Sequence, residues 1–234
     1  MNTPNQVFQT QWQEKLQGTI SAEYVPGSNL RVDAALRTLA PGKRLLDVGC
    51  GTGLLSLAVR DKFDEIHGID VAEAAVLAAR ARGQMAQRID LNSEPLPFPS
   101  EFFDAVTMLA VLPYVYDPVH SLRECHRVLR PGGKLVLSAA NMRTVGKLVS
   151  TYVLGRFPST SKGASVGYDG GALHYFCSWN LANLLKNAGF SVVRANGTHF
   201  RPSFLRHFPT RIPLVSQFLR EFFAGEIMLE ATRS

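Results

Sequence analysis

The sequence predicts an α/β fold: a doubly wound, largely parallel sheet with helices on both faces. Two observations carry this prediction. Short apolar runs of strand length alternate with helix-like stretches from residue 44 to residue 141, which is the order of parallel βαβ units. The run LLDVGCGTG at 45–53 places a glycine-rich turn directly after the first of these strands, where doubly wound sheets bind their ligands.

The expected elements follow one another along the chain. Strands are expected at RLLDVG (44–49), EIHGID (65–70), QRIDL (87–91), FFDAVTMLAVL (102–112) and KLVLSAA (134–140). Helices are expected between them at 54–63, 71–83 and 118–130; Gly83 ends the second, and Pro131, Gly132 and Gly133 stop the third. After Asn141 we expect helices at 142–154 and 179–190 and strands at 191–197 and 226–233.

Composition excludes several classes of protein. Apolar residues make up 46% of the chain and charged residues 19%, and no apolar run is long enough to cross a membrane. The first residues, MNTPNQVFQTQWQEK, lack the basic start and apolar stretch of a secretory signal, so a cytoplasmic location is expected. Cys50, Cys125 and Cys177 are widely spaced, which predicts reduced thiols and no metal site.

The net charge of +6 is unevenly distributed. Residues 1–141 carry 14 Lys and Arg against 15 Asp and Glu, whereas residues 142–234 carry 11 against 4. The C-terminal part therefore either meets an anionic partner or presents a solvated basic face.

The glycine turn indicates a nucleotide-like ligand. Gly49, Gly51 and Gly53 let backbone N–H groups approach a ligand beside the N-terminus of the next helix. The spacing is G-x-G-x-G, with Leu54 next, and this departure from G-x-G-x-x-G counts against a dinucleotide.

Three aspartates lie at or near the carboxyl ends of neighbouring expected strands. Asp70 can accept both hydroxyl groups of a ribose, and Asp90 can accept from an exocyclic amine, so the two outline an adenosine. The alternative is that these residues only cap the helix or loop that follows. Because Asp47, Asp70 and Asp90 all lie in register with the glycine turn, we favour the ligand site.

At these motifs the sequence resembles the class I S-adenosylmethionine-dependent methyltransferases. LLDVGCGTG resembles their first motif, IHGIDV the second, IDLNSEPLPFPSEFFDAVTM the acidic adenine motif with the fourth strand, and RVLRPGGKLVLS the end of the core. The resemblance covers residues 44–140. It implies a Rossmann-like sheet of seven strands, with the last strand antiparallel and inserted between the fifth and the sixth.

The resemblance also implies which residues bind the cofactor, S-adenosylmethionine. By position these are Asp47, Gly49, Cys50, Gly51, Gly53, Asp70, Val71, Asp90, Leu91, Leu109 and Ala110. Asp70 would hold the ribose hydroxyls, Val71 would pack on the adenine, and Asp90 with Leu91 would bind its amine edge. The glycine turn, braced by Asp47, would line the methionine and ribose side, and Leu109 with Ala110 would border the sulfonium. Related members often have Glu-His where this chain has Pro113-Tyr114, so no role built on that histidine transfers.

His174, in GGALHYF, is the candidate general base for a hydroxyl acceptor. The alternative is that its ring bonds a backbone carbonyl and anchors the loop. Tyr114, Tyr116 and Tyr175 are the candidate acceptor-binding residues.

A single domain is expected over residues 1–234. It comprises an N-terminal lid or helical segment (1–43), the cofactor-binding core (44–141), an acceptor-side insertion (142–177), and a C-terminal helix and strands (178–234). Trp12 and Tyr24 in the first segment either serve the lid or pack a leading helix. The C-terminal part includes a basic aromatic connector at 198–223, for which packing, a membrane surface and nucleic acid are alternatives in that order.

These observations predict a cytoplasmic enzyme that transfers a methyl group from S-adenosylmethionine to a small-molecule acceptor and releases S-adenosylhomocysteine. Oxygen is favoured over nitrogen or carbon as the acceptor atom. A lipid- or quinone-linked acceptor at a membrane surface and a non-catalytic S-adenosylmethionine-binding scaffold are the alternatives. Both a monomer and a homodimer are compatible with the sequence.

Overall fold

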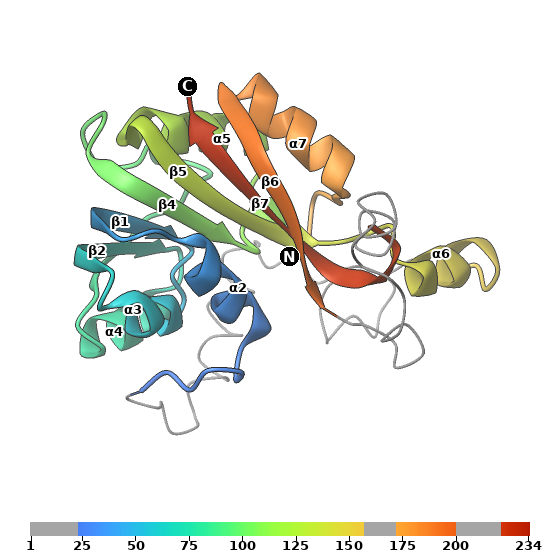
Figure 1. Cartoon of the computed structure of the whole chain (residues 1–234), viewed down its shortest axis with the longest axis horizontal. Helices are drawn as coiled ribbons and strands as arrows, with labels where there is room; N and C mark the ends of the chain where they lie inside the picture. Colours follow the sequence, from blue (N-terminus) through green and yellow to red (C-terminus); the bar gives the residue numbers. More distant parts are fainter. Residues whose placement is uncertain (1–22, 157–171, 200–220) are drawn as a thin grey trace.

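The computed structural model of the chain describes residues 23–156, 172–199 and 221–234. One sheet contains the strands β1 (Gly42–Val48), β2 (Phe63–Asp70), β3 (Met85–Arg88), β4 (Phe103–Leu109), β5 (Leu129–Ala140), β6 (Phe190–His199) and β7 (Ala224–Arg233). Their order across the sheet is β3-β2-β1-β4-β5-β7-β6. Strand β7 runs antiparallel to both of its neighbours, and the pairs from β3 to β5 are parallel. The predicted doubly wound sheet, with its last strand antiparallel and inserted, is confirmed (Figure 1).

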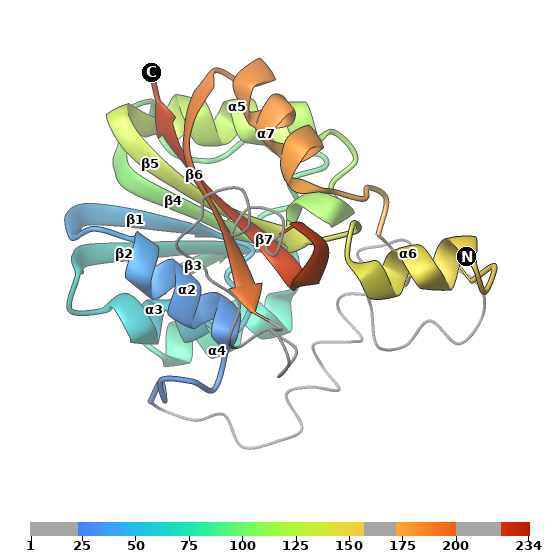
Figure 2. The ribbon, with the colours of Figure 1, turned by 45° about the vertical axis from the view of Figure 1, so that its right-hand side comes forward.

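Helices cover both faces of this sheet (Figures 1 and 2). They are α2 (Leu30–Thr38), α3 (Leu54–Val59), α4 (Glu73–Ala81), α5 (Pro118–Val128), α6 (Val145–Tyr152), α7 (Ser178–Asn187) and the 3₁₀ helix η1 (Leu112–Tyr114). Successive residues of a strand point to opposite faces, and accordingly Leu45 packs with α2 and α3 while Leu46 packs with α5 and α7. The two apolar layers fix the sheet between its helices.

Several element boundaries differ from those expected. Because Gly42 pairs with Phe63, β2 begins early and α3 ends at Val59. Strand β3 pairs with β2 only as far as Arg88, which lies opposite Asp70. Asp90 therefore lies two residues beyond the end of β3. Strand β5 starts at Leu129 and continues through the Pro-Gly-Gly stretch, with a register shift opposite β4. Strand β4 ends at Leu109, and Leu112, the last residue of the expected fourth strand, begins the helix η1.

The segments on either side of the core are described only in part. Tyr24 donates its hydroxyl to Asp33 Oδ1 at 2.6 Å and so ties the chain before α2 to that helix. Helix α6 extends away from the sheet (Figures 1 and 2) and buries none of its residues. Trp12 and most of the 198–223 connector lie outside the described residues, and the division of the chain into segments stays a prediction.

Candidate functional site

A cavity of about 410 Å³ opens at the carboxyl ends of β1, β2 and β4. It lies where a doubly wound sheet binds ligands, at the point where strand order reverses on either side of β1. The predicted residues that line it are Asp47, Gly49, Cys50, Gly51, Asp70, Val71, Asp90, Leu91, Leu109, Ala110 and Tyr114. The structure therefore brings together side chains that lie up to 67 positions apart in the sequence, from Asp47 to Tyr114.

The glycine turn connects β1 to α3 in a left-handed conformation. Gly49, Gly51 and Gly53 have φ angles of 74°, 52° and 77°, which disfavour other residues. A Cβ atom on Gly49 would lie 2.1 Å from Val111 Cγ2, so packing also requires glycine there. Gly49 N and Cys50 N donate to the Ile69 carbonyl at 2.8 and 2.9 Å, which anchors the turn to β2.

Gly53 and the thiol of Cys50 face α4. Gly53 does not line the cavity; a Cβ there would lie 3.1 Å from Ala79 Cα and 3.0 Å from Gln84 Oε1. Close approach of α4 explains this glycine, and its assignment to the cofactor site stays a prediction. Burial raises the pKa of the Cys50 thiol, so this cysteine is an unreactive packing group beneath the turn.

Asp70 ends β2 with its carboxylate held by two backbone N–H groups. Gly51 N donates to Oδ2 at 2.9 Å and Ala72 N to Oδ1 at 2.9 Å. Burial raises the pKa of Asp70, and these hydrogen bonds oppose the rise. Since an ionised carboxylate has about four acceptor positions, each oxygen can accept a further bond from the cavity.

Asp47 is a buried carboxyl group in the floor of the cavity. Only 3% of the residue is exposed, and its Oδ1 accepts the Thr107 hydroxyl at 2.7 Å. Burial raises the pKa of Asp47 to about 7, the negative charge of Asp70 adds to this rise, and the Thr107 bond opposes it. A cation in the cavity would favour the ionised form.

The loop after β3 forms the wall that carries Asp90. Asp90 Oδ1 accepts Asn92 N at 3.0 Å, and Asn92 Oδ1 accepts Tyr116 N at 2.7 Å. The loop thus joins the Asp90 wall to the segment that follows β4.

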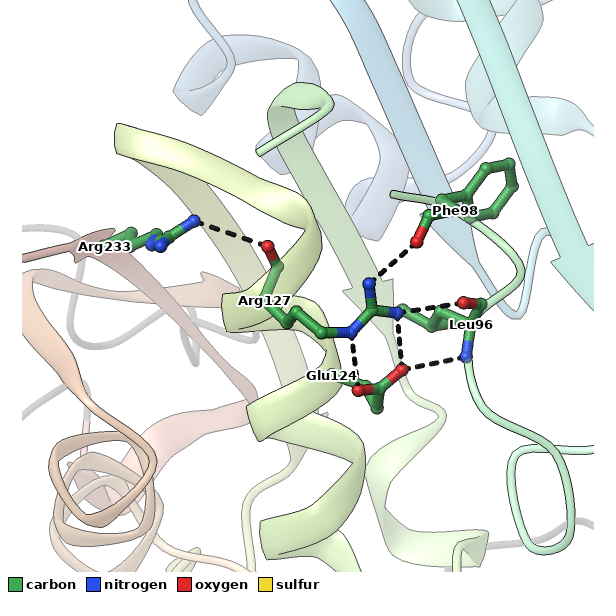
Figure 3. A network of polar contacts seen from close by, with 5 residues as sticks. All are labelled: Leu96, Phe98, Glu124, Arg127 and Arg233. Atoms are coloured by element: carbon green, nitrogen blue, oxygen red, sulfur yellow. Dashed lines mark hydrogen bonds and ion pairs between the residues drawn. The ribbon is translucent and has the colours of Figure 1, made fainter. Parts of the chain in front are cut away.

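Arg127 of α5 fixes the far end of that loop (Figure 3). Its Nη1 donates to the Phe98 carbonyl at 2.8 Å and its Nη2 to the Leu96 carbonyl at 2.9 Å. Nη2 also pairs with Glu124 Oε2 at 2.7 Å, and the guanidinium lowers the pKa of Glu124. The main chain after Asp90 is therefore held against α5, which packs on the sheet through Leu122, Cys125 and Val128.

The end of β4 supplies a strained residue to the lining. Ala110 has a φ of 57°, a conformation that costs a residue with a Cβ roughly 1–2 kcal/mol. Its N–H donates to the Ser138 carbonyl at 3.0 Å, which helps to hold it. Such strain is commonly found at functional sites.

His174 braces the segment after β4 from outside the cavity. Its Nε2 lies 3.0 Å from the Val115 carbonyl oxygen, and Leu173 N and His174 N both lie within hydrogen-bond distance of the Pro113 carbonyl, at 2.7 and 3.2 Å. Such contacts are the ones expected if His174 anchors its loop by bonding a backbone carbonyl. Because a carbonyl only accepts, Nε2 carries the proton and Nδ1 remains the nitrogen that could act as a base.

Neither Tyr116 nor Tyr175 lines the cavity; the two are 58% and 46% exposed. Of the three tyrosines assigned to the acceptor, the structure brings Tyr114 alone to the cavity.

Helix α2 contributes residues that sequence reasoning missed. Asn29, Arg31 and Val32 line the cavity, and Asn29 Oδ1 caps the helix by accepting Arg31 N and Val32 N at 3.1 and 3.2 Å. An asparagine before a helix-like run is an N-cap signal that could have located this helix, although not its contact with the cavity.

Residues 23–156, 172–199 and 221–234 contain no group of three or more His, Cys, Asp or Glu side chains placed to hold a metal ion. None of the helices in those ranges is long and apolar enough to cross a membrane.

Residues 46–137, less than half of the chain, match the model described as "Methyltransferase domain". The ubiquinone biosynthesis O-methyltransferase of Pseudomonas aeruginosa (strain LESB58) is 38% identical over 106 residues, which are 43% of this chain and 45% of that protein. Its counterpart from Idiomarina loihiensis is 34% identical over 126 residues, or 50% and 52% of the two chains. The chain thus spans about half the length of the curated relatives it matches.

Solved structures share the fold over more of the chain. An S-adenosylmethionine-dependent methyltransferase from Thermotoga maritima superposes with a TM-score of 0.68 at 20% identity and covers 99% of this chain and 100% of its own. The [4+2]-cyclase SpnF superposes with a TM-score of 0.64 at 22% identity, covering 99% and 97%. One fold therefore accommodates different reactions, and the residues of the site must decide between them.

Proposed function

We propose that the core of this chain, whose residues 46–137 match a methyltransferase domain, is a class I S-adenosylmethionine-dependent methyltransferase domain. In this proposal the chain transfers the methyl group of S-adenosylmethionine to an oxygen atom of a small-molecule acceptor. One observation carries the proposal: Asp47, Asp70 and Asp90 border one cavity together with the glycine turn. Each is a carboxylate that can accept hydrogen bonds from a different donor group of the nucleoside.

The residues around the cavity fit the functional groups of S-adenosylmethionine. Asp70, held by backbone N–H groups, suits two vicinal ribose hydroxyls. Asp90 suits an exocyclic amine, and Asp47 suits the ammonium of the methionine part. Arg31 is the cationic side chain in the described lining and suits the methionine carboxylate.

When bound, S-adenosylmethionine supplies a methyl group that its sulfonium already activates. The protein then has to position an acceptor and keep water away. Leu109, Ala110 and Val111 form an apolar border after β4 that suits the second task. Tyr114 continues this border and is our candidate contact for the acceptor.

A hydroxyl acceptor has to lose a proton during transfer. His174 is our candidate base through Nδ1, since Nε2 is bonded to the Val115 carbonyl. The names of the matched relatives, ubiquinone biosynthesis O-methyltransferases, support oxygen as the acceptor atom.

An acceptor carried by a lipid or quinone at a membrane surface is the second candidate. It is favoured by α6, which buries none of its residues and ends at Tyr152. The side chains of Tyr152 and of the next two residues, Val153 and Leu154, are 82%, 73% and 60% exposed. Exposed apolar and aromatic residues of this kind suit an interface with lipid.

A transfer assay tests the proposal. The purified chain is incubated with radiolabelled S-adenosylmethionine and with the aqueous and lipid fractions of an extract of the organism that encodes it. Label in an aqueous product, lost in Asp70→Ala and retained in Asp64→Ala, supports the main proposal. Asp64 is the matched control because it lies on the same strand and is exposed. Label in lipid favours the second candidate. No label in any fraction, with S-adenosylhomocysteine still bound, would leave a non-catalytic scaffold.

A further inference from the structure

Arg31 reaches the cavity from α2 but is held by the opposite end of the sequence. Its Nε donates to Glu226 Oε1 at 2.6 Å, and the same oxygen accepts the Ser138 hydroxyl at 2.5 Å. Glu226 belongs to β7 and Ser138 to β5, and neither lines the cavity. Two strands behind the site therefore fix a cation that faces it.

Burial makes this contact more than a solvated ion pair. The side chain of Glu226 is 15% exposed and that of Arg31 is 40% exposed, while Ser138 is fully buried. Because Nε is taken by Glu226, the pair constrains the plane of the guanidinium. The two terminal nitrogens have no hydrogen-bond partner within the described residues, so they can donate to a ligand.

Ser138 attaches a second lining residue to the same pair of strands. Its carbonyl oxygen accepts Ala110 N at 3.0 Å, and Ala110 is the strained residue that borders the cavity after β4. One buried serine thus connects to Arg31 through Glu226 and to Ala110 through its main chain. The β5–β7 pair underlies this end of the cavity.

The order of the strands indicates which part of the cofactor this end receives. Asp90 follows β3, Asp70 ends β2, the glycine turn follows β1, and Ala110 follows β4. Adenine, ribose and sulfur placed along this series leave the amino acid part of the methyl donor on the side of β5 and β7. We propose that Glu226 and Ser138 are positioning residues that orient Arg31 for the carboxylate of the bound methyl donor; this inference rests on the proposed function.

Two opposing effects decide the sign of a Glu226 substitution. The negative charge of Glu226 repels a ligand carboxylate, but that charge is already compensated by Arg31 at 2.6 Å. A free arginine would lose rotamer freedom when the ligand binds, whereas Glu226 has restricted it beforehand. Orientation dominates in our account, so Glu226→Ala weakens binding. Glu226→Gln keeps an acceptor oxygen for Arg31 Nε and for the Ser138 hydroxyl, and it restores most of the affinity.

Calorimetric titration with two ligands tests the inference. S-adenosylhomocysteine carries the amino acid carboxylate, and 5′-methylthioadenosine shares the adenosine and the thioether but lacks the amino acid. Glu226→Ala should weaken the binding of S-adenosylhomocysteine about 3- to 10-fold and leave the affinity for 5′-methylthioadenosine unchanged. Arg31→Gln should weaken the first ligand further, and adding Glu226→Ala to it should have no additional effect.

Glu230→Ala is the matched control. Glu230 lies on the same strand, its side chain is likewise 15% exposed, and it pairs with Lys134, which is 40% exposed, at 3.2 Å. It does not line the cavity, so the affinity for S-adenosylhomocysteine should not change, while any loss of Tm should resemble that of Glu226→Ala.

Several outcomes would overturn the inference. Equal loss of affinity for both ligands in Glu226→Ala would indicate a general distortion of the site. Tighter binding of S-adenosylhomocysteine would mean that charge repulsion dominates. An unchanged affinity for S-adenosylhomocysteine would remove the positioning role. If Arg31→Gln spared S-adenosylhomocysteine and raised only the KM of an acceptor, Arg31 would serve the acceptor instead. Failure of the wild-type chain to bind either ligand would contradict the proposed function itself.

Discussion

Asp47→Asn is expected to stabilise the fold at pH 8 and at the same time to weaken cofactor binding. Asp47 is 3% exposed, and burial raises its pKa from an ordinary 3.8 to about 7. Between these values the folded chain binds a proton that the unfolded chain releases. The stability contributed by this group is therefore fully present below pH 4 and is lost as the pH rises through 7.

The shift sets the size of the effect. About three pKa units at 1.36 kcal/mol each correspond to at most about 4 kcal/mol of unfolding free energy lost above pH 7. Asparagine has nearly the same shape, keeps an oxygen for the Thr107 hydroxyl and never ionises. For a chain of this size, recovery of about 2–4 kcal/mol corresponds to a rise in Tm of roughly 4–16 °C.

Thermal unfolding of the wild-type chain and of Asp47→Asn between pH 4.5 and pH 8 measures this difference in stability. The advantage of Asp47→Asn should be largest at pH 8 and should shrink steadily as the pH falls. Asp64→Asn, at an exposed position, should show no such trend. In Asp47→Asn, S-adenosylhomocysteine should bind about 10-fold or more weakly, because a charged hydrogen bond to its ammonium is lost. A stability difference independent of pH, or a loss of stability at pH 8, would refute the account of Asp47.

Three further predictions concern the turn, the ribose site and the loop. Gly49→Ala should destabilise the chain by about 2–4 kcal/mol in urea unfolding, because φ is 74° and its Cβ would overlap Val111; Val111→Ala in the same chain should recover part of the loss, and no recovery would rule out the overlap. Asp70→Ala should cost about 1.5–3 kcal/mol of S-adenosylhomocysteine affinity by calorimetry, and unchanged affinity would contradict the ribose assignment. His174→Ala should lower turnover about 10²-fold or more if the residue is the base, with little change in cofactor affinity. If it only anchors Val115, His174→Gln, which keeps a donor, should restore the rate.

The succession of strands along the chain could be predicted because most strands carry an apolar run, whereas the antiparallel insertion of the last strand followed from the family resemblance alone. Their ends could not, since β3 is four residues long and its limits are set by pairing with β2 rather than by local preference. The same is true of β5, whose start at Leu129 depends on Phe103 across the sheet.

The part of the site built from strand ends was also predictable. Asp47 and Asp70 each follow an apolar run, and parallel strands bring such residues to one edge of the sheet. Arg31 was not predictable, because its contact with Glu226 spans 195 positions and no local pattern records it. Gly53 shows the opposite case, in which a glycine that fits a binding motif is explained by packing against Ala79.

The most direct test of the central claim is a titration of the wild-type chain with S-adenosylhomocysteine by calorimetry, with NADH as the control. The account predicts micromolar binding of S-adenosylhomocysteine and none of NADH, because Asp47, Asp70 and Asp90 surround a cavity suited to an adenosine with a zwitterionic tail. Binding of NADH instead, or of neither ligand, would contradict it.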